Sequence, residues 1–248
     1  MSDWGGVLGC EPDEYSDRLY HKRPEWAVGT ISHHDARFLF GRVLSSQADV
    51  LIEVGTASGL STAFLCHAAD RAHAAGRIGS DFHVHSYDID TQFYADRSRG
   101  VGDGAREMLD DALLEHITFH APATAATIRE QHDVDSIEFA FIDAAHKHPW
   151  PALDLLAMLV CLQPAADVLL HDINLPRVTP EEPTYGAKLL FDELDVEKEA
   201  DRGGPIPNIG AIRIPDDKAG LREQLLSLID GHEWEVEPPP DQLRLALA

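Results

Sequence analysis

Cysteine is scarce in this chain: Cys10, Cys66 and Cys161 are the only three in 248 residues. They are far apart and odd in number, and no Cys-x-x-Cys pair occurs, which argues against a zinc knuckle and a dithiol redox site. Cys66 and Cys161 fall within apolar helical patterns. We therefore expect both to be buried small hydrophobic residues.

Long apolar runs are also missing. No stretch approaches the roughly 18 consecutive apolar residues that a membrane-spanning helix needs. The N-terminal stretch MSDWGGVLGCEPDEY has neither the basic flank nor the apolar core of a secretion signal. We therefore expect a cytoplasmic protein that does not interact with membranes.

Positive charge is the third shortage. The chain has 20 Lys and Arg residues against 43 Asp and Glu residues, which gives a formal net charge of −23. Such a field repels phosphate backbones and anionic lipids, so nucleic acid and membrane surfaces are poor partners. Two explanations of the acidity stay open: adaptation to a salty host, and a genome biased toward Ala, Arg and Asp codons.

What the sequence does contain is an alternation of strand and helix patterns from about residue 30 to residue 214. Such alternation favours parallel strands joined by right-handed crossovers. We therefore predict an α/β fold, a doubly wound sheet with helices on both faces. The expected strands are 49–54, 82–87, 117–120, 137–142 and 168–170, and the expected helices are 32–45, 58–69, 108–113, 123–130 and 149–162.

Beyond Asp172 the alternation loosens. A helix is expected at 185–194, a strand at 208–214 and a last helix at 218–229, and Pro238-Pro239-Pro240 predicts a tail that is surface-bound or loose. No linker interrupts the repeats. We therefore predict one main domain at 31–214, preceded by an N-terminal extension at 1–30 and followed by a helix and tail at 215–248 that pack on it.

Carboxylates stand at the ends of four of the five predicted parallel strands: Glu53, Asp88, Asp143 and Asp172. In open α/β sheets, ligands bind at the carboxyl edge of the strands. Exposed strand ends are often polar for no functional reason, which accounts for one or two such residues and poorly for the whole set. We therefore expect the functional site at this edge.

The first loop reads Glu53-Val-Gly55-Thr-Ala-Ser58-Gly59-Leu-Ser61. Its glycines allow a tight turn and close approach to a ligand, and the following helix offers free N–H groups. The spacing matches neither the dinucleotide fingerprint nor the phosphate-binding loop, which needs a lysine. Glu53 would repel a pyrophosphate but favour an ammonium or sulfonium group. S-adenosylmethionine carries both of these groups and no phosphate.

Asp88 and Asp90 follow the second strand. A carboxylate at this place can accept hydrogen bonds from both hydroxyls of a ribose. The alternative is that either residue only caps the next helix. We assign the ribose role to Asp88 and the cap to Asp90.

Four segments in this order resemble a known family: VLIEVGTASGLST, YDID, SIEFAFIDAAHKHPW and VLLHDINLP. They look like class I methyltransferases of the catechol and caffeoyl-CoA O-methyltransferase type. They are closer still to the bacterial small-molecule enzymes of the methyltransferase family 24 type. The resemblance spans about residues 30–214 and implies a seven-stranded Rossmann-like sheet, mostly parallel, with an antiparallel last strand. It also implies an S-adenosylmethionine-dependent enzyme acting on a hydroxyl of a small molecule.

The resemblance assigns the cofactor contacts residue by residue. The first loop falls on the family's methionine side, Asp88 on its ribose carboxylate, and Ala121 and Pro122 on the loop beside the adenine, while Asp143 and His146 border the cofactor. The positions implied in the first loop are Glu53, Gly55, Thr56, Ser58, Gly59 and Ser61.

In metal-dependent members, the residues matching Asp143 and Asp172 hold a divalent ion, here expected to be Mg²⁺. Ends of neighbouring strands lie about 4.8 Å apart, and two carboxylates with water and substrate oxygens are typical magnesium ligands. Such an ion lowers the pKa of a bound hydroxyl. Ile173 interrupts the family's Asp-Asn pair, so the third ligand is His171 or Asn174, or no metal binds.

The proton acceptor is open among three residues near these aspartates: His171, Lys147 and His146. We rank His171 first because an imidazole titrates near neutral pH without special tuning. Asp143 completes the predicted catalytic set.

Three alternative functions stay open. One is a metal-independent methyltransferase with His171 as base, and another is a non-catalytic protein that binds S-adenosylmethionine. A nicotinamide dehydrogenase is the weakest alternative, because its glycine fingerprint is absent. The expected partners are a small-molecule acceptor and, as an alternative to a monomer, a second copy of the chain.

One further pattern has no assigned role. His83 and His85 share one face of the second strand, a spacing that can bind a metal ion. No third ligand stands near them in the sequence.

Overall fold

The computed structural model describes residues 5–181 and 183–247, so the ends of the predicted extension and tail, 1–4 and 248, lie outside the described residues. The chain divides into two compact units, Met1–Ala123 and Thr124–Ala248. Each unit is described by itself below.

Seven strands form a mixed sheet in the order β3-β2-β1-β4-β5-β7-β6. The first unit holds β1, β2 and β3, whose neighbours pair in parallel. In the second unit β4 and β5 are parallel, and β7 is antiparallel to both β5 and β6. The α/β class and the antiparallel last strand are confirmed. The bounds are β1 Val50–Val54, β2 His83–Tyr87, β3 Ile117–His120, β4 Ile137–Ile142, β5 Leu162–His171, β6 Lys198–Ala200 and β7 Ile209–Arg213.

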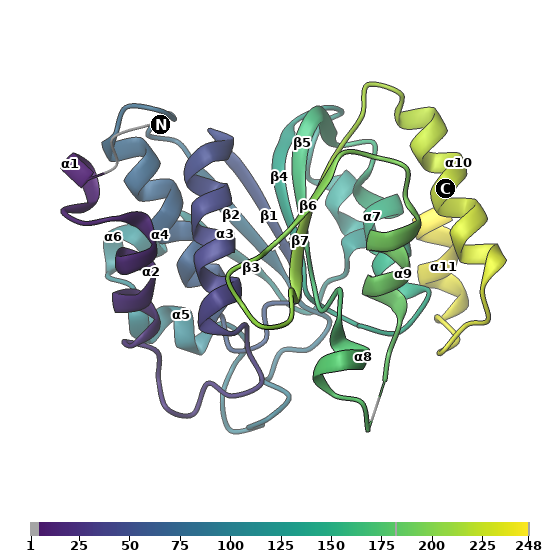
Figure 1. The fold of residues 1–248 in the computed structure, drawn as a ribbon, viewed down its shortest axis with the longest axis horizontal. Coiled ribbons are helices and arrows are strands. Elements are labelled where there is room, and N and C mark those ends of the chain that lie inside the picture. Colours follow the sequence, from purple (N-terminus) through teal and green to yellow (C-terminus); the bar gives the residue numbers. More distant parts are fainter. Residues whose placement is uncertain (1–4, 182, 248) are drawn as a thin grey trace. The chain divides into compact units, whose positions relative to one another are not determined.

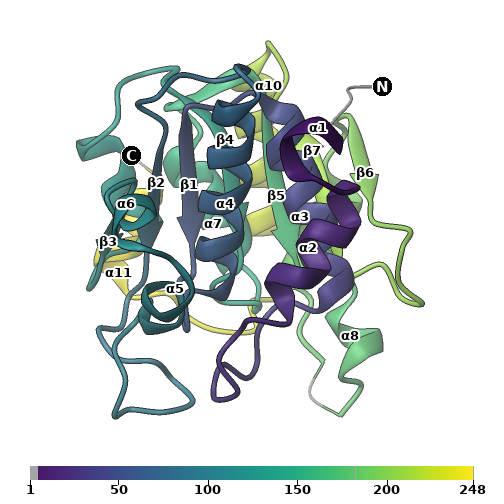
Figure 2. The ribbon, with the colours of Figure 1, turned by 90° about the vertical axis from the view of Figure 1, so that its left-hand side faces the viewer.

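The helices of the first unit pack beside one another and against its strands, with α2 on α3 and α3 on α4 (Figure 2). The helix α3 begins at a capping box in which Ser32 and Asp35 bond each other's backbone N–H groups. Its start confirms the prediction from Ser32. The bounds are α1 Gly5–Leu8, α2 Pro12–Tyr20, α3 His33–Ser46, α4 Leu60–Ala74, α5 Asp103–Met108 and α6 Asp111–Leu114.

The helices of the second unit centre on α7, which contacts α9, α10, α11 and the 3₁₀ helix η1. Figure 1 shows α7, α9, α10 and α11 on the same side of β4, β5 and β7. The helix α7 is buried almost throughout because its sequence, WPALDLLAM, is apolar on nearly every side. The bounds are η1 Ala125–Glu130, α7 Trp150–Met158, α8 Leu175–Val178, α9 Gly186–Glu193, α10 Lys218–Gly231 and α11 Pro240–Leu247.

Some element boundaries differ from the sequence prediction. The expected helix at 108–113 is broken because Asp110 turns extended and caps α6, accepting from the Leu113 N–H. Helix α7 ends at Met158 and β5 begins early, at Leu162. The residue pattern did not predict the short strand β6, because its sequence Lys-Glu-Ala has no apolar alternation.

The C-terminal tail is not loose. Residues 240–247 form α11, which packs on α7 and η1. Pro240 suits the first turn of a helix, and Leu243, Ala246 and Leu247 fall on one helical face. Of the two predictions for the tail, only surface attachment holds.

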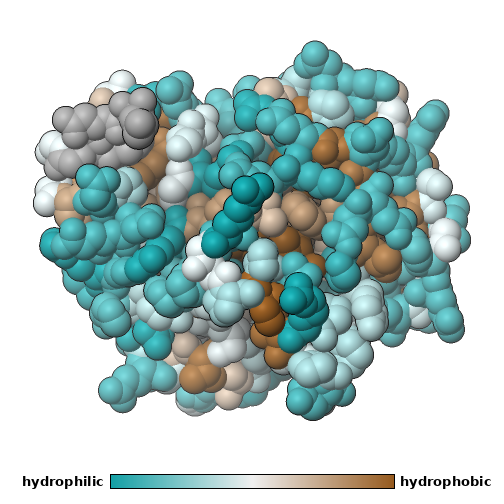
Figure 3. All heavy atoms as spheres, viewed as in Figure 1, coloured by the Kyte–Doolittle hydropathy of each residue, from teal (hydrophilic) through white to brown (hydrophobic). Residues whose placement is uncertain are grey.

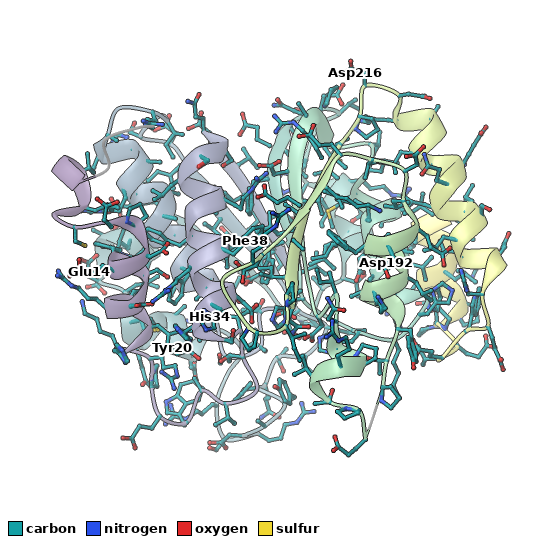
Figure 4. All side chains as sticks on the ribbon, in the orientation of Figure 1. Glu14, Tyr20, His34, Phe38, Asp192 and Asp216 are labelled. Atoms are coloured by element: carbon teal, nitrogen blue, oxygen red, sulfur yellow. The ribbon has the colours of Figure 1, made fainter. Side chains whose placement is uncertain are left out.

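Burial and exposure follow the composition. Cys66 and Cys161 are buried, as predicted. Hydrophilic side chains dominate the face in Figure 3. Glu14 on α2, Asp192 on α9 and Asp216 before α10, labelled in Figure 4, are exposed members of the acidic excess. Among the described residues, no helix is both long and apolar enough to cross a membrane.

Candidate active site

The segment at residues 53–61, which runs from the end of β1 through the connecting loop into α4 and is called the cofactor loop below, is held to the end of β2 through its backbone. The Gly55 N–H donates to the Tyr87 carbonyl over 2.8 Å, and the Ala57 N–H donates to Asp88 Oδ2 over 2.8 Å. Ala57 adopts a left-handed φ of 47° within this turn. The predicted cofactor positions in this loop and Asp88 are therefore brought together by main-chain geometry.

Gly59 is required at the start of α4. Its φ is +86°, and a Cβ there would lie 2.8 Å from the Gly102 Cα and 3.0 Å from the Ala105 Cβ. The segment 102–104 contacts this loop, and the Gly104 N–H donates to the Ser58 carbonyl over 2.7 Å. The predicted Ser58 or Ser61 start is thus replaced by Gly59 as the N-cap of α4.

Glu53 lies fully buried at the end of β1. Its carboxylate accepts from the hydroxyls of Thr62 and Ser86, and the Thr56 and Ser86 hydroxyls are 2.6 Å apart. The Thr62 and Ser86 hydroxyls both bond the same carboxylate oxygen, Oε2, and so offset part of the cost of burying the carboxylate. Glu53 thereby ties β1, β2 and α4 together directly beneath the loop.

Asp88 follows β2 with both carboxylate oxygens engaged. Oδ2 accepts from the Ala57 N–H and Oδ1 from the Asp90 N–H over 2.9 Å. Each ionised oxygen retains acceptor capacity, so two vicinal hydroxyls can still bind. The exposed Ala121 and Pro122 adjoin this point, since the Ala123 N–H donates to the Asp88 carbonyl over 2.7 Å. Asp90 is no helix cap, because α5 begins only at Asp103; its carboxylate pairs with Arg97 instead.

The second unit gathers four titratable side chains, which we call the Asp–His cluster: Asp143, His146, His171 and Asp172. Asp143 directly follows β4, and His171 is the last residue of β5. His171 Nδ1 lies 2.9 Å from Asp143 Oδ1 and 3.5 Å from Asp172 Oδ1. His146 Nε2 lies 3.0 Å from Asp172 Oδ2 and 3.5 Å from Asp143 Oδ1. Each imidazole therefore faces both carboxylates.

These contacts shift the titration of the cluster. Burial disfavours the charge on His146, but hydrogen bonds to Asp143 and Asp172 outweigh it and raise its pKa to about 10. Burial acts the same way on His171, and the charges of both carboxylates still raise its pKa well above the usual range. Burial would raise the pKa of Asp172, yet His171 and His146 lower it. The ordinary imidazole pKa on which the preference for His171 as base was founded therefore does not hold in this fold.

Asp172 has a third partner, which the sequence did not predict. The Asn208 side-chain N–H₂ donates to Asp172 Oδ1 over 2.7 Å, whereas the Asn174 side chain donates to the Pro207 carbonyl. Asn208 immediately precedes β7, and His171 pairs with Ile209 in the antiparallel register. An antiparallel last strand necessarily begins beside the end of β5, and that inference could have found Asn208.

The loop that carries His146 is braced from two later segments. The Gly186 N–H donates to the His146 carbonyl over 3.0 Å, and a Cβ on Gly186 would come within 2.8 Å of this loop's backbone. Glu235 accepts from the His148 N–H over 2.6 Å and from the Tyr185 N–H over 3.0 Å, and its own N–H donates to the His148 carbonyl. Neither Gly186 nor Glu235 belongs to a sequence motif, so neither was predicted.

Lys147 lies on the same loop but is exposed. Among the described residues, no hydrogen bond or ion pair joins its ammonium group to the carboxylates of the cluster. Its role as a base remains a prediction.

The cluster has suitable donors for a divalent cation. One ligand atom each from Asp143, His146 and Asp172 lies within 4.8 Å of the others. The mixed oxygen and nitrogen set is more typical of Mn²⁺ or Zn²⁺ than of Mg²⁺, which prefers oxygen ligands alone. These residues therefore fit a metal ion, with His146 rather than Asn174 facing the two aspartates.

Comparison with known proteins finds a sequence match that covers part of each unit. Residues 52–173 match the sequence profile of a family described as a methyltransferase domain. This span begins inside β1 and ends just after Asp172, and it contains the loop, Asp88 and the whole Asp–His cluster. No curated relative matches the sequence.

Solved structures share the fold at low identity. The O-methyltransferase TomG from Streptomyces achromogenes, in complex with S-adenosylmethionine, is 16% identical over 86% of this chain and 100% of its own, with a TM-score of 0.52. An O-methyltransferase from Bacillus cereus, in complex with S-adenosylhomocysteine, is 16% identical over 85% of this chain and 94% of its own, with a TM-score of 0.52. A methyltransferase from Geobacter sulfurreducens is 17% identical over 83% of this chain and 89% of its own, with a TM-score of 0.53.

Proposed function

We propose that this chain, whose residues 52–173 match the profile of a methyltransferase domain, is a class I methyltransferase that transfers a methyl group from S-adenosylmethionine to a hydroxyl of a small molecule. In that reaction the bond from carbon to sulfur breaks as a bond from carbon to the acceptor oxygen forms. The hydroxyl proton leaves to a base, and S-adenosylhomocysteine remains. The chain's main task is to hold the oxygen in line with the sulfonium.

The cofactor part of the proposal rests mainly on the hydrogen bonding of the Asp88 carboxylate. Backbone N–H groups of Ala57 and Asp90 fix both of its oxygens at the end of β2, with acceptor capacity left for a ribose. Beside it, the glycines of the loop carry no side chain that would keep a ligand from the backbone. The loop also lacks the lysine that a phosphate ligand would need.

The Asp–His cluster supports the acceptor part. Its residues would hold a divalent ion through Asp143, His146 and Asp172, and such an ion supplies positive charge that lowers the pKa of a nearby hydroxyl. His171 orients both carboxylates through its Nδ1–H, and Asn208 fixes Asp172 from the other side. Asp143, His146 and the loop residues complete the proposed cofactor contacts.

A metal-free version of the same reaction is the second candidate. It is favoured by the contacts of His146 and His171, which already give both carboxylates a cationic partner. In that version the imidazolium groups stabilise the acceptor oxygen electrostatically, and the acceptor proton goes to a carboxylate or to water.

Calorimetric titration of S-adenosylhomocysteine, first with Mn²⁺ or Mg²⁺ and then with EDTA, tests the cofactor site. We expect micromolar affinity, reduced at least about tenfold in Asp88→Asn because a charged hydrogen-bond acceptor is lost. The matched control is Asp90→Asn, whose carboxylate pairs with Arg97 at the surface. No binding by folded wild-type protein would overturn the proposal.

A screen of hydroxylated acceptors with S-adenosylmethionine tests the chemistry. Formation of S-adenosylhomocysteine together with a product heavier by one methylene group supports the proposal. Full activity in EDTA selects the metal-free version. Tight cofactor binding without transfer to any phenol, catechol or alcohol would favour a non-catalytic binding protein.

A further inference from the structure

Four imidazoles gather on the neighbouring strands β2 and β3, and none of them is among the side chains of the cofactor loop or of the Asp–His cluster. His83 and His85 alternate along β2, so their side chains leave the same face. His116 precedes β3 and His120 ends it. The register pairs His85 with Thr118 and Tyr87 with His120. The structure thus supplies the additional histidine that the sequence pattern at 83 and 85 lacked.

The closest contact is between two ring nitrogens. His85 Nδ1 lies 3.2 Å from His120 Nε2, and the two rings are 5.4 Å apart and inclined by only 21°. Two imidazole nitrogens bound to one tetrahedral Zn²⁺ at about 2.0–2.1 Å lie about 3.3–3.4 Å apart. The distance between the two ring nitrogens therefore differs by only about 0.2 Å from the distance expected if both bound one zinc ion.

The surroundings orient this pair. The Tyr87 ring stacks on His120 at 4.3 Å with an angle of 10° between the planes, and the His83 ring lies 4.7 Å from that of His85. His83 itself is positioned by the Thr118 hydroxyl, 2.8 Å from its Nε2. Partners of this kind hold ligand rings in place in metal sites. All three histidines are half-buried, so water can complete the coordination.

We propose that His85 and His120 form a binding site for a zinc-type divalent transition-metal ion, with His83 as the adjacent third imidazole. Imidazole is a ligand of choice for Zn²⁺, Ni²⁺ and Cu²⁺ and a poor one for Mg²⁺ and Ca²⁺. The net charge of −23 raises the local concentration of any cation. Bound metal clamps the edge strand β3 to β2.

Calorimetric titration of ZnCl₂ into untagged, EDTA-treated full-length protein tests the proposal. His85→Gln and His120→Gln each remove one ligand and should weaken one zinc-binding event at least about tenfold. His116→Gln is the matched control, because its Nδ1 contacts the Phe82 carbonyl and its ring stacks on Phe82. Asp172→Asn, which disturbs the Asp–His cluster, should leave this event in place.

A second readout separates lost metal binding from lost folding. Zn²⁺ should raise the melting temperature of the wild type and of His116→Gln by more than that of His85→Gln or His120→Gln, because only the Asp–His cluster can still bind zinc in those two variants; each melt is measured beside the same variant in EDTA. Equal zinc affinity in wild type, His85→Gln and His120→Gln would overturn the proposal. So would an affinity abolished by Asp172→Asn alone.

Discussion

The cofactor loop of the first unit and the Asp–His cluster of the second are built from different materials. The loop is made from backbone: N–H groups and left-handed turns fix it, and its buried carboxylate, Glu53, accepts hydrogen bonds from neutral hydroxyls at Oε2. The cluster is made from charged side chains whose pKa values depend on one another. The loop should therefore respond to shape changes, and the cluster to changes of charge and pH.

The largest effect is expected from Asp172→Asn. Removing one carboxylate leaves His146 and His171 facing a single anion in a buried place, and breaking a buried ion pair costs about 3–5 kcal/mol of unfolding free energy. Asn tolerates the left-handed φ of 60° at this position, so the backbone is not the cause. Urea unfolding in EDTA at pH 6.5 measures the loss.

The same variant sharpens the contrast between the two regions. Its affinity for S-adenosylhomocysteine should stay within about threefold of the wild type, because the loop does not depend on Asp172. The matched control is Asp192→Asn, an exposed carboxylate on α9. A stability loss below about 1 kcal/mol would mean that the cluster is not a buried ionic network.

Asp154, a buried carboxylate of the second unit, should also make stability depend on pH. It is buried within the apolar helix α7, and burial raises its pKa to about 7. An acid with a raised pKa in the folded state destabilises that state as pH rises from about 4 to 7, and the penalty is complete above 7. Asp154→Asn should therefore raise the unfolding free energy at pH 8 by about 2–4 kcal/mol and have little effect at pH 4. Equal effects at both pH values would contradict this reasoning.

Gly59→Ala tests the loop by shape alone. A methyl group at φ +86°, 2.8 Å from the Gly102 Cα, strains the turn, which should cost about 1–3 kcal/mol of stability. We also expect at least a tenfold loss of S-adenosylhomocysteine affinity at every pH. The control is Gly41→Ala in α3, where a Cβ meets nothing within 4 Å. Unchanged affinity would show that the ligand does not depend on this turn.

The smallest effect is expected from salt. With a net charge of −23, raising KCl from 0.1 M to 2 M screens repulsion among exposed carboxylates and should add about 1 kcal/mol to the unfolding free energy. Urea unfolding at several KCl concentrations measures it. Indifference to KCl would favour codon bias as the origin of the acidity.

The backbone-built region was the more predictable one. Gly55, Gly59 and Asp88 could be assigned because strand ends and glycines mark such a turn within a few residues of sequence. In the Asp–His cluster the sequence supplied the four members, but not their contacts. Asn208 lies 36 residues from Asp172 and Glu235 lies 87 residues from His148, and no local pattern connects them. The pKa of His171 was likewise misjudged, because it depends on carboxylates that only the fold brings near.

The hydrogen bonds of Glu235 affect the order in which the two regions can fold during synthesis. The hydrogen bonds described for the cofactor loop join residues within the first unit. The loop of His146 receives its bonds to Glu235 only after 87 further residues follow His148. On the ribosome, where N-terminal regions fold first, the loop and Asp88 can form while the Asp–His cluster still lacks its final support. A nascent chain would thus form its cofactor loop well before its Asp–His cluster is fully supported.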